Sequence, residues 1–184
     1  MNPVFSTTSS VWRFLPGVLL LLSGFAYAGV MGSKPDSASR ILSLHHTHTG
    51  ASLTVTYYRE GQYQSQALAQ LDEFLADFRT GETTPMDPEV YDILYRLHDK
   101  AGSQAPFQII SAYRSPATNE MLRKPGSGVA QKSQHLLGKA LDVRLADVSS
   151  EQLYDIALSM QAGGVGYYRD SDFVHVDTGR VRHW

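Results

Sequence analysis

Two histidines and an aspartate in the C-terminal half of the chain are residue types that bind a catalytic zinc ion. His135 and Asp142 lie in the stretch S-Q-H-L-L-G-K-A-L-D, and His175 lies in the later stretch F-V-H-V-D. A catalytic zinc is usually held by three such side chains, and the fourth position is left to a water molecule that becomes the nucleophile. The three residues therefore predict a site for hydrolysis. The residues alone also allow a second interpretation, because a strand histidine is more often a hydrogen-bonded core or surface residue than a ligand.

Two short strands would bring Asp142 and His175 together. The glycine between His135 and Asp142 argues against a continuous helix, so we expect His135 on a loop and Asp142 on a strand over residues 140–145. A second strand is expected over residues 173–177. Side chains alternate between the two faces of a strand. Adjacent strands could therefore present Asp142 and His175 to one ion.

The pattern S-x-H-x-x-G-x-A-x-D, followed by a histidine on a later strand, resembles the zinc peptidases of the D-Ala-D-Ala carboxypeptidase and hedgehog-type group. The resemblance implies that His135, Asp142 and His175 bind Zn²⁺ and that Arg114, in the motif S-A-Y-R-S, lies beside the metal. A guanidinium donates in a planar fork, which suits a substrate carboxylate or a developing oxyanion. The structural alternative for Arg114 is a salt bridge that fastens the next loop.

The end of the chain narrows the resemblance to the murein endopeptidase K-like branch of this group. The stretches G-G-V-G-Y-Y and F-V-H-V-D-T-G and the closing R-H-W carry the similarity, which extends over residues 41–184. It implies hydrolysis of peptide cross-links in peptidoglycan, chiefly the L,D link between two diaminopimelate residues, with the D-alanine to diaminopimelate link as a further substrate. Two alternatives stay open: a D,D- or L,D-carboxypeptidase that trims stem peptides, and a wall-binding module without catalysis.

The general base has two candidates. Many members of the group carry a glutamate three residues before the late histidine, and Asp172, which is one methylene shorter, occupies that place. Asp177 competes with it, because it lies two residues after His175 and on the same predicted face. Either carboxylate could instead orient a ligand imidazole through its second nitrogen. Ser133 and Tyr168 are candidates for substrate contact. The structural alternative for Ser133 is support of the turn, and for Tyr168 it is a place in the core.

The first 28 residues have the pattern of an export signal. Arg13 precedes an apolar run at 14–22, and A-Y-A at 26–28 fits the small-residue cleavage rule. An uncleaved anchor is the alternative, but the apolar run is shorter than the roughly 20 residues that a bilayer span needs. No two arginines are adjacent, which favours the general secretory route over the twin-arginine route. We therefore expect a periplasmic protein.

Composition is ordinary for one globular domain. The 184 residues have a formal net charge of −2, which gives no general sign of nucleic-acid binding, and they include no cysteine. The absence of cysteine excludes disulfides and lipid attachment at an N-terminal cysteine. We expect a flexible leader at 29–40 and one zinc peptidase domain at 41–184. Peptidoglycan is the expected partner, without nucleic acid or a stable membrane span, and the protein is assumed to be a monomer.

Hydrophobic periodicity predicts an α+β fold, in which a small, mainly antiparallel sheet carries the ligands and packs against helices. Asp87 followed by proline marks the start of one helix, and Ser149 with a glutamine three residues later marks another. Three histidines at 45–48 are expected in a polar hairpin turn, not in a second metal site. The expected helices cover residues 66–79, 88–101, 116–122 and 149–160, and the expected strands cover residues 41–44, 53–58, 107–110, 140–145, 165–168 and 173–177.

Overall fold

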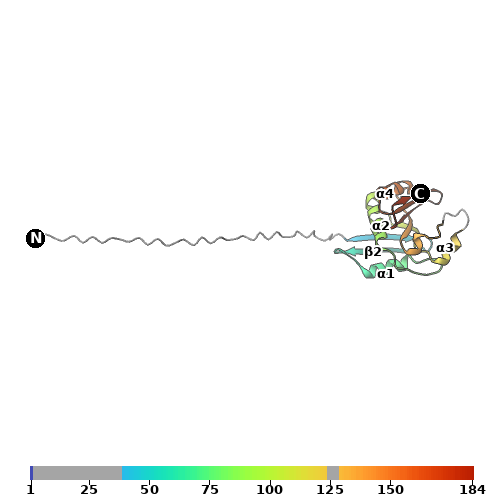
Figure 1. Cartoon of the computed structure of the whole chain (residues 1–184), viewed down its shortest axis with the longest axis horizontal. Coiled ribbons are helices and arrows are strands. Elements are labelled where there is room, and N and C mark those ends of the chain that lie inside the picture. Colours follow the sequence, from blue (N-terminus) through green and yellow to red (C-terminus); the bar gives the residue numbers. More distant parts are fainter. Residues whose placement is uncertain (2–38, 124–128) are drawn as a thin grey trace. The chain divides into compact units, whose positions relative to one another are not determined.

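The computed structural model describes Met1, residues 39–123 and residues 129–184, and the elements of this part are marked in Figure 1. The predicted signal peptide, and the predicted leader up to residue 38, lie outside the described residues. No helix in the described part is long and apolar enough to cross a membrane. The elements in chain order are β1 (Arg40–His46), β2 (Ser52–Arg59), β3 (Gln62–Tyr63), α1 (Ser65–Phe74), α2 (Pro88–Ala101), β4 (Phe107–Ser111), α3 (Pro116–Leu122), η1 (Gln134–Leu137), β5 (Ala140–Arg144), α4 (Ser150–Ser159), β6 (Gly164–Tyr168), η2 (Arg169–Ser171), β7 (Phe173–Asp177) and β8 (Arg182–His183).

The eight described strands form one sheet in the order β3-β2-β1-β4-β5-β7-β6-β8. Two neighbouring pairs, β1 with β4 and β6 with β8, are parallel, and the other pairs are antiparallel. The α+β class and the mainly antiparallel sheet are therefore confirmed. The expectation of a small sheet is wrong, because all eight described strands belong to one sheet. The two-residue strands β3 and β8 form its two edges.

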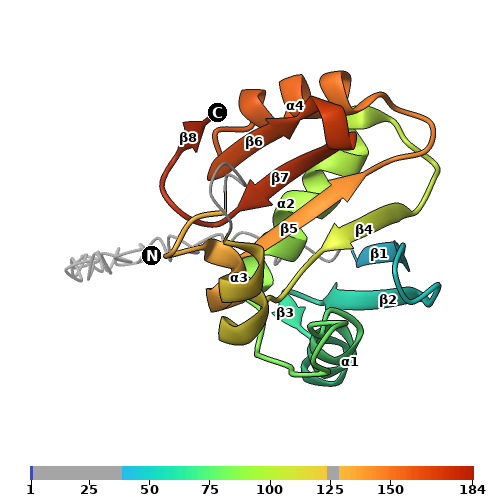
Figure 2. The same cartoon turned by 90° about the vertical axis from the view of Figure 1, so that its right-hand side faces the viewer.

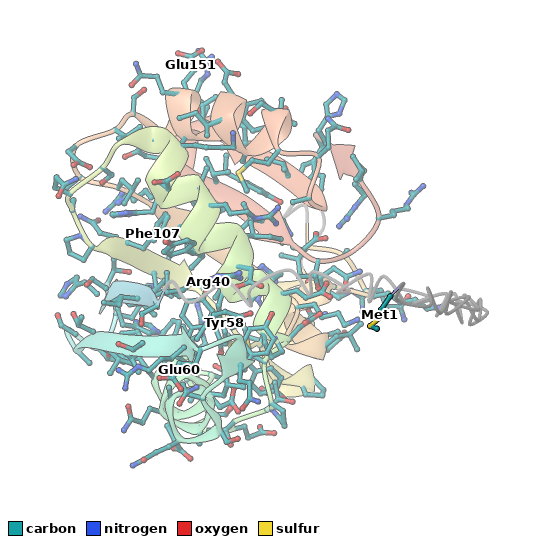
Figure 3. All side chains as sticks on the ribbon, turned by 90° about the vertical axis from the view of Figure 1, so that its left-hand side faces the viewer. Met1, Arg40, Tyr58, Glu60, Phe107 and Glu151 are labelled. Carbon is teal, nitrogen blue, oxygen red and sulfur yellow. The ribbon has the colours of Figure 1, made fainter. Side chains whose placement is uncertain are left out.

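Helix α2 covers one face of this sheet. It lies behind β4 and β5 in Figure 2 and in front of the sheet in the opposite view of Figure 3, where Phe107 of β4 lies beside it. The ring of Phe107 is 5.5 Å from that of His98 on α2. Asp87 caps the helix by accepting a hydrogen bond from the Glu89 amide, and Gly102 ends it at a φ of 62°. Four apolar residues of α2 are buried: Val90, Ile93, Leu94 and Leu97.

Strands β5 and β7 are antiparallel neighbours near the middle of the sheet, as the sequence predicts. Asp142 on β5 lies directly opposite His175 on β7. The alternate positions on both strands are apolar and join the hydrophobic core: Leu141, Val143, Val174 and Val176. One face of this strand pair is therefore packed, and the other presents Asp142 and His175.

Helix α1 ends earlier than the sequence pattern indicates. The expected helix runs to Arg79, but α1 stops at Phe74. The carboxylate of Asp77 accepts hydrogen bonds from the amides of Arg79, at 3.0 Å, and Ser115, at 2.9 Å. An aspartate side chain that bonds nearby amides competes with the helical hydrogen-bond pattern. The chain therefore turns after Phe74 and joins α1 to the segment before α3.

Two further expectations need correction. His45 and His46 continue β1 and do not lie in the turn, and His46 is buried with its ring 5.6 Å from that of Phe78. His135 lies on the 3-10 turn η1 and not on an irregular loop. Gly138 ends this turn at a φ of 65°, a conformation that glycine adopts without steric cost. The turn fixes the direction of the His135 side chain.

Candidate metal centre

The side chains of His135, Asp142 and His175 converge on one point. The Nε2 atom of His135 is 3.2 Å from Asp142 Oδ1 and 3.2 Å from His175 Nδ1. His175 Nδ1 is 2.8 Å from the same Asp142 oxygen. All three residues are buried, and their ligand atoms lie within 4.8 Å of one another. The structure thus brings together the three residues that the sequence singles out.

Each imidazole is oriented by an acceptor on its far side. His135 Nδ1 is 2.7 Å from the carbonyl oxygen of Ala112, and His175 Nε2 is 2.9 Å from Asp177 Oδ2. Both oxygens only accept, so these nitrogens carry the ring protons. The lone pairs of the other two ring nitrogens then face Asp142. Two nitrogen lone pairs and one carboxylate oxygen are a donor set that fits a divalent transition metal, and such outer acceptors are typical of metal-bound histidines.

The electrostatics of the centre favour the metal-binding forms of Asp142 and His135. Burial acts to raise the pKa of Asp142, but the adjacent imidazoles outweigh it and hold that pKa well below its usual range. Burial lowers the pKa of His135, which keeps this ring neutral. Burial alone would lower the pKa of His175 too, but Asp142 and Asp177 together raise it. A metal therefore competes with a proton mainly on His175.

Asp177 is fully buried and every direction around its carboxylate is occupied. Its Oδ1 accepts from the amides of Gly164 and Gly179 at 3.1 and 2.8 Å, and from Arg182 at 3.0 Å. Its Oδ2 accepts from Arg182 at 2.6 Å and from His175 at 2.9 Å. Burial opposes the charge of Asp177, but these donors hold its pKa well below the usual range. The contacts suit a residue that orients His175.

Asp172, the other candidate base, is not brought to the ligand atoms. It follows η2 with a φ of 50°, and its side chain is largely exposed. Ser150 Oγ donates to Asp172 Oδ1 at 2.6 Å, and Arg144 lies 3.5 Å from Oδ2. These partners lie at the start of α4 and the end of β5. Asp172 does not line the cleft beside the ligand residues.

Arg114 lies beside the ligand set, as the sequence predicts. Its terminal nitrogen is 3.5 Å from Asp142 Oδ2 and 3.3 Å from Ser111 Oγ. Its Nε atom is buried and has no hydrogen-bond partner among the described residues. The backbone amide of Arg114 also donates to the carbonyl oxygen of His135 at 3.2 Å. The same segment therefore supplies a cation next to the centre and holds the turn that carries His135.

A cleft of about 440 Å³ opens over the centre. Ser133 lines it and caps η1, since its Oγ accepts from the amide of His135. Tyr168 also lines it. Among the described residues, Asp142 is the single carboxylate of the lining, against three basic side chains. The lining consists of Arg114, Val129, Ala130, Lys132, Ser133, Gln134, His135, Asp142, Tyr168, Ser171, Phe173, His175, Arg182 and Trp184.

Arg182 and Trp184 both line the cleft, although no sequence motif predicts a role for them. Arg182 begins β8 (Arg182–His183) and Trp184 follows its last residue, and a strand of two residues is too short to give a strand pattern. The two residues are two positions apart, as are the glycines at 164 and 166. This matching spacing is the sequence signal that could have predicted their place in the cleft. Side chains at alternate positions of a strand share a face, and glycines opposite them leave room for large groups.

Comparisons with known proteins identify the family of this chain. The profile of the family described as peptidoglycan L,D-endopeptidase MepK matches residues 34–184. The chain belongs to this peptidase family. It is 41% identical, over 172 residues, to the peptidoglycan L,D-endopeptidase MepK of Escherichia coli strain K12, a match that covers 90% of this chain and 94% of the relative. A probable MepK of Haemophilus influenzae is 37% identical over 177 residues, which covers 94% of this chain and 93% of the relative. No solved structure matches the chain. The resemblance predicted from the sequence is confirmed.

Proposed function

We propose that this protein is a zinc-dependent endopeptidase that hydrolyses the L,D link between diaminopimelate residues of cross-linked peptidoglycan. Membership of the MepK family supports the reaction class and the substrate class. The observation that carries the metal part is the convergence of His135 Nε2, His175 Nδ1 and Asp142 Oδ1, with the second nitrogen of each ring held by its own acceptor. Zinc supplies Lewis acidity, which polarises a carbonyl group and acidifies water.

The residues around the ligands have separate roles in this proposal. Arg114 donates to the oxygen of the scissile carbonyl as that oxygen gains negative charge, which its position 3.5 Å from Asp142 and its unpartnered Nε support. Asp177 positions His175 and is not the base, because all its acceptor directions are used. Asp172 supports the turn between β6 and β7. Ser133 holds the turn of His135.

The charge of the cleft supports an anionic substrate. Arg114, Lys132 and Arg182 line the cleft, but Arg114 lies beside Asp142 and Arg182 is paired with the buried Asp177. Among the described residues, Lys132 therefore adds the uncompensated positive charge, although the whole chain has a net charge of −2. A cleft lined by one sign of charge attracts ligands of the opposite sign. Each diaminopimelate residue of a cross-link carries a carboxylate that is not part of the stem peptide backbone. We propose that these carboxylates are what the basic lining recognises.

The proposal includes export to the periplasm. The A-Y-A sequence at 26–28 after an apolar run supports a signal at 1–28, followed by a leader at 29–40 and a catalytic domain at 41–184. Expression of the full chain in a Gram-negative host, followed by Edman sequencing of the periplasmic product, should give a mature protein that begins at Gly29. A membrane-bound product that retains Met1 would show an anchor instead.

Digestion of defined muropeptides tests the reaction. Purified dimers joined by the L,D link between diaminopimelates, or by the D-alanine to diaminopimelate link, are incubated with zinc-loaded protein and analysed by mass spectrometry. We expect the L,D dimers to be converted to monomers at least tenfold faster than the other dimers, and His135→Ala to leave both intact. Shortened stems with intact dimers would identify a carboxypeptidase. Intact dimers and stems, in spite of bound zinc, would favour a wall-binding module.

A further inference from the structure

Two side chains at the edge of the sheet, Arg182 of β8 and Trp184 directly after β8, reach across β6 to the strand that carries His175. Strand β8 pairs in parallel with β6, with Arg182 beside Gly164. Arg182 binds both oxygens of Asp177, and the ring of Trp184 lies 5.2 Å from the ring of His175. Both residues line the cleft. The edge strand thus contributes directly to the surroundings of the metal ligand.

Glycines in β6 make this crossing possible. A Cβ atom on Gly166 would lie 2.5 Å from the indole ring of Trp184, and one on Gly164 would meet the guanidinium of Arg182. At both glycines, this approach is shorter than a real Cβ contact. Gly166 also lies directly opposite His175 in the sheet. Strand β6 therefore leaves a gap at the position where the indole must pass to reach the cleft.

The indole of Trp184 is held in place by several contacts. Its Nε1 donates to the hydroxyl oxygen of Tyr168 at 3.1 Å. The backbone amide of Trp184 donates to the carbonyl oxygen of Val165, and the carbonyl oxygen of Trp184 accepts from the amide of Tyr167. The guanidinium of Arg182 lies 5.0 Å from the ring. An aromatic side chain fixed in this way has already lost most of the conformational freedom that binding would cost.

Trp184 nevertheless stays 47% exposed. A tryptophan whose role is only to shield His175 or to fill the core gains nothing from that exposure, because the stabilisation comes from apolar surface removed from water. An exposed, immobilised indole at the wall of a cleft is typical of a side chain that contacts a ligand. Its apolar surface is next to basic side chains, and the combination suits a ligand with both methylene and carboxylate groups.

We propose that Trp184 is a substrate-contacting residue, whose indole packs against the methylene chain of the diaminopimelate residue beside the scissile bond. This inference rests on the proposed function, and it names the part of the substrate that the site reads. The methylenes are the apolar part of that residue, and its charged ends can reach the basic lining. Tyr168 shares the subsite: because its oxygen accepts from Trp184, its own proton is available for a substrate oxygen.

Kinetics of three variants in the zinc-loaded full chain test the inference with the L,D-linked dimer. Trp184→Ala should raise KM about tenfold, which is the loss expected when a few methylenes lose their apolar partner. Trp184→Phe keeps a ring and should raise KM about threefold or less. His183→Ala is the matched control, since His183 is the exposed residue directly before Trp184 and does not line the cleft. It should match the wild type.

The zinc content of each variant separates a substrate contact from a shield. We expect Trp184→Ala to bind as much zinc as the wild type. Loss of zinc from Trp184→Ala with an unchanged KM would overturn the inference and make the indole a cover for His175. Equal KM values for Trp184→Ala and the wild type would overturn it as well.

Tryptophan fluorescence gives a readout that does not need turnover. The chain has two tryptophans, at 12 and 184, so Trp12→Phe leaves Trp184 as the single emitter. Titration of this variant with a disaccharide-tripeptide monomer that ends in diaminopimelate should quench or shift the emission in a saturable way. The same tripeptide with alanine in place of diaminopimelate should need at least a tenfold higher concentration for the same change in emission. Emission that does not respond to the diaminopimelate peptide, in protein that cuts the dimer normally, would contradict the contact.

The two readouts also separate this inference from the proposed function. A saturable fluorescence response in protein that leaves the L,D dimer intact would remove the proposed reaction and keep the diaminopimelate subsite. Dimer cleavage that is insensitive to Trp184→Ala would keep the reaction and remove the subsite. Cleavage together with a raised KM in Trp184→Ala supports both.

Discussion

The carboxylates of Asp172 and Asp177 lie three residues before and two residues after His175 in the sequence, and they have different surroundings. Asp177 is buried, and its two oxygens are shared between His175, Arg182 and two backbone amides. Asp172 is exposed and bonds Ser150. The first arrangement fixes a ligand ring, and the second fixes a turn.

Asparagine substitutions distinguish the two aspartates. Asp177→Asn replaces an acceptor by an amide group, which leaves His175 or Arg182 without its partner, so we expect zinc affinity to fall about 10- to 100-fold. Asp172→Asn, the matched change, should keep zinc affinity and at least a third of kcat/KM. Zinc affinity is measured by competition with a chromophoric chelator. A loss of kcat of more than a hundredfold in Asp172→Asn, with zinc still bound, would instead identify Asp172 as the base.

Gly164 has a measurable packing role. A Cβ atom there would lie 2.5 Å from Asp177 Oδ2 and would also meet the guanidinium of Arg182. Gly164→Ala should therefore lower the free energy of unfolding by about 1–3 kcal/mol, as overpacking does in well-packed sites. Urea unfolding measures this change. The double variant with Arg182→Ala should lose less than the sum of the single losses, and strict additivity would count against the crowding.

At the scale of the elements, Asp77 joins the end of α1 to the start of α3. It is 1% exposed, and it accepts from the amide of Ser115, which is also the N-cap of α3. The segment held in this way follows Arg114 directly. The contact thus connects scaffold elements to Arg114, the cation beside the candidate metal ligands.

The stability of the protein should depend on the ionisation of Asp77. Burial acts to raise its pKa, but hydrogen bonds from Thr118, Ser115 and Arg79 outweigh it and lower the pKa from 3.8 to about 2. The folded pKa is the lower one, so this stabilisation is complete above pH 3.8 and is lost as the pH falls through 2. It amounts to about 2 kcal/mol. The difference in unfolding free energy between the wild type and Asp77→Asn should shrink by that amount from pH 5 to pH 2. A constant difference would contradict this assignment.

Sequence pattern predicts the elements whose signals are local. The caps Asp87 and Ser149 mark the starts of α2 and α4, and alternation along two strands places Asp142 beside His175. The premature end of α1 is not predictable, because Asp77 bonds an amide 38 residues away. Contacts of this kind depend on the tertiary fold.

The details of the metal centre depend even more on the fold. Ligand types and a motif predict His135, Asp142 and His175. They do not predict that the carbonyl oxygen of Ala112 orients His135, because a backbone carbonyl leaves no trace in residue types. The surroundings of Asp177 depend on β8, whose two residues give no periodic signal. Sequence therefore points to the candidate ligands His135, Asp142 and His175 but not to the groups that orient them.

At the scale of the whole molecule, the sign of charge differs between the cleft and the chain. The chain has a formal net charge of −2, whereas the lining of the cleft is basic. Association with an anionic peptide should therefore weaken as salt rises, since the Debye length falls from about 10 Å at 0.1 M to about 3 Å at 1 M.

A matched pair of lysine substitutions tests this local charge. Lys132→Gln should lower kcat/KM for the L,D-linked dimer about threefold at low salt, in line with about 0.7 kcal/mol for an exposed charge pair, and the difference should vanish at 1 M salt. Lys100→Gln makes the same change in net charge on an exposed residue of α2 outside the cleft. We expect it to match the wild type. Equal losses of kcat/KM in the two variants would mean that the net charge of the protein, and not the charge of the cleft, controls association with the substrate.

If His135, Asp142 and His175 hold one zinc ion that is required for cleavage of the L,D cross-link, activity should follow the zinc content. Zinc is titrated into metal-stripped protein, and dimer cleavage is followed by mass spectrometry. We expect no cleavage without metal and full activity at one equivalent of zinc, whereas His135→Ala should stay inactive at every zinc concentration that leaves it folded. Full cleavage by the metal-stripped protein, or by His135→Ala, would show that this zinc ion is not required.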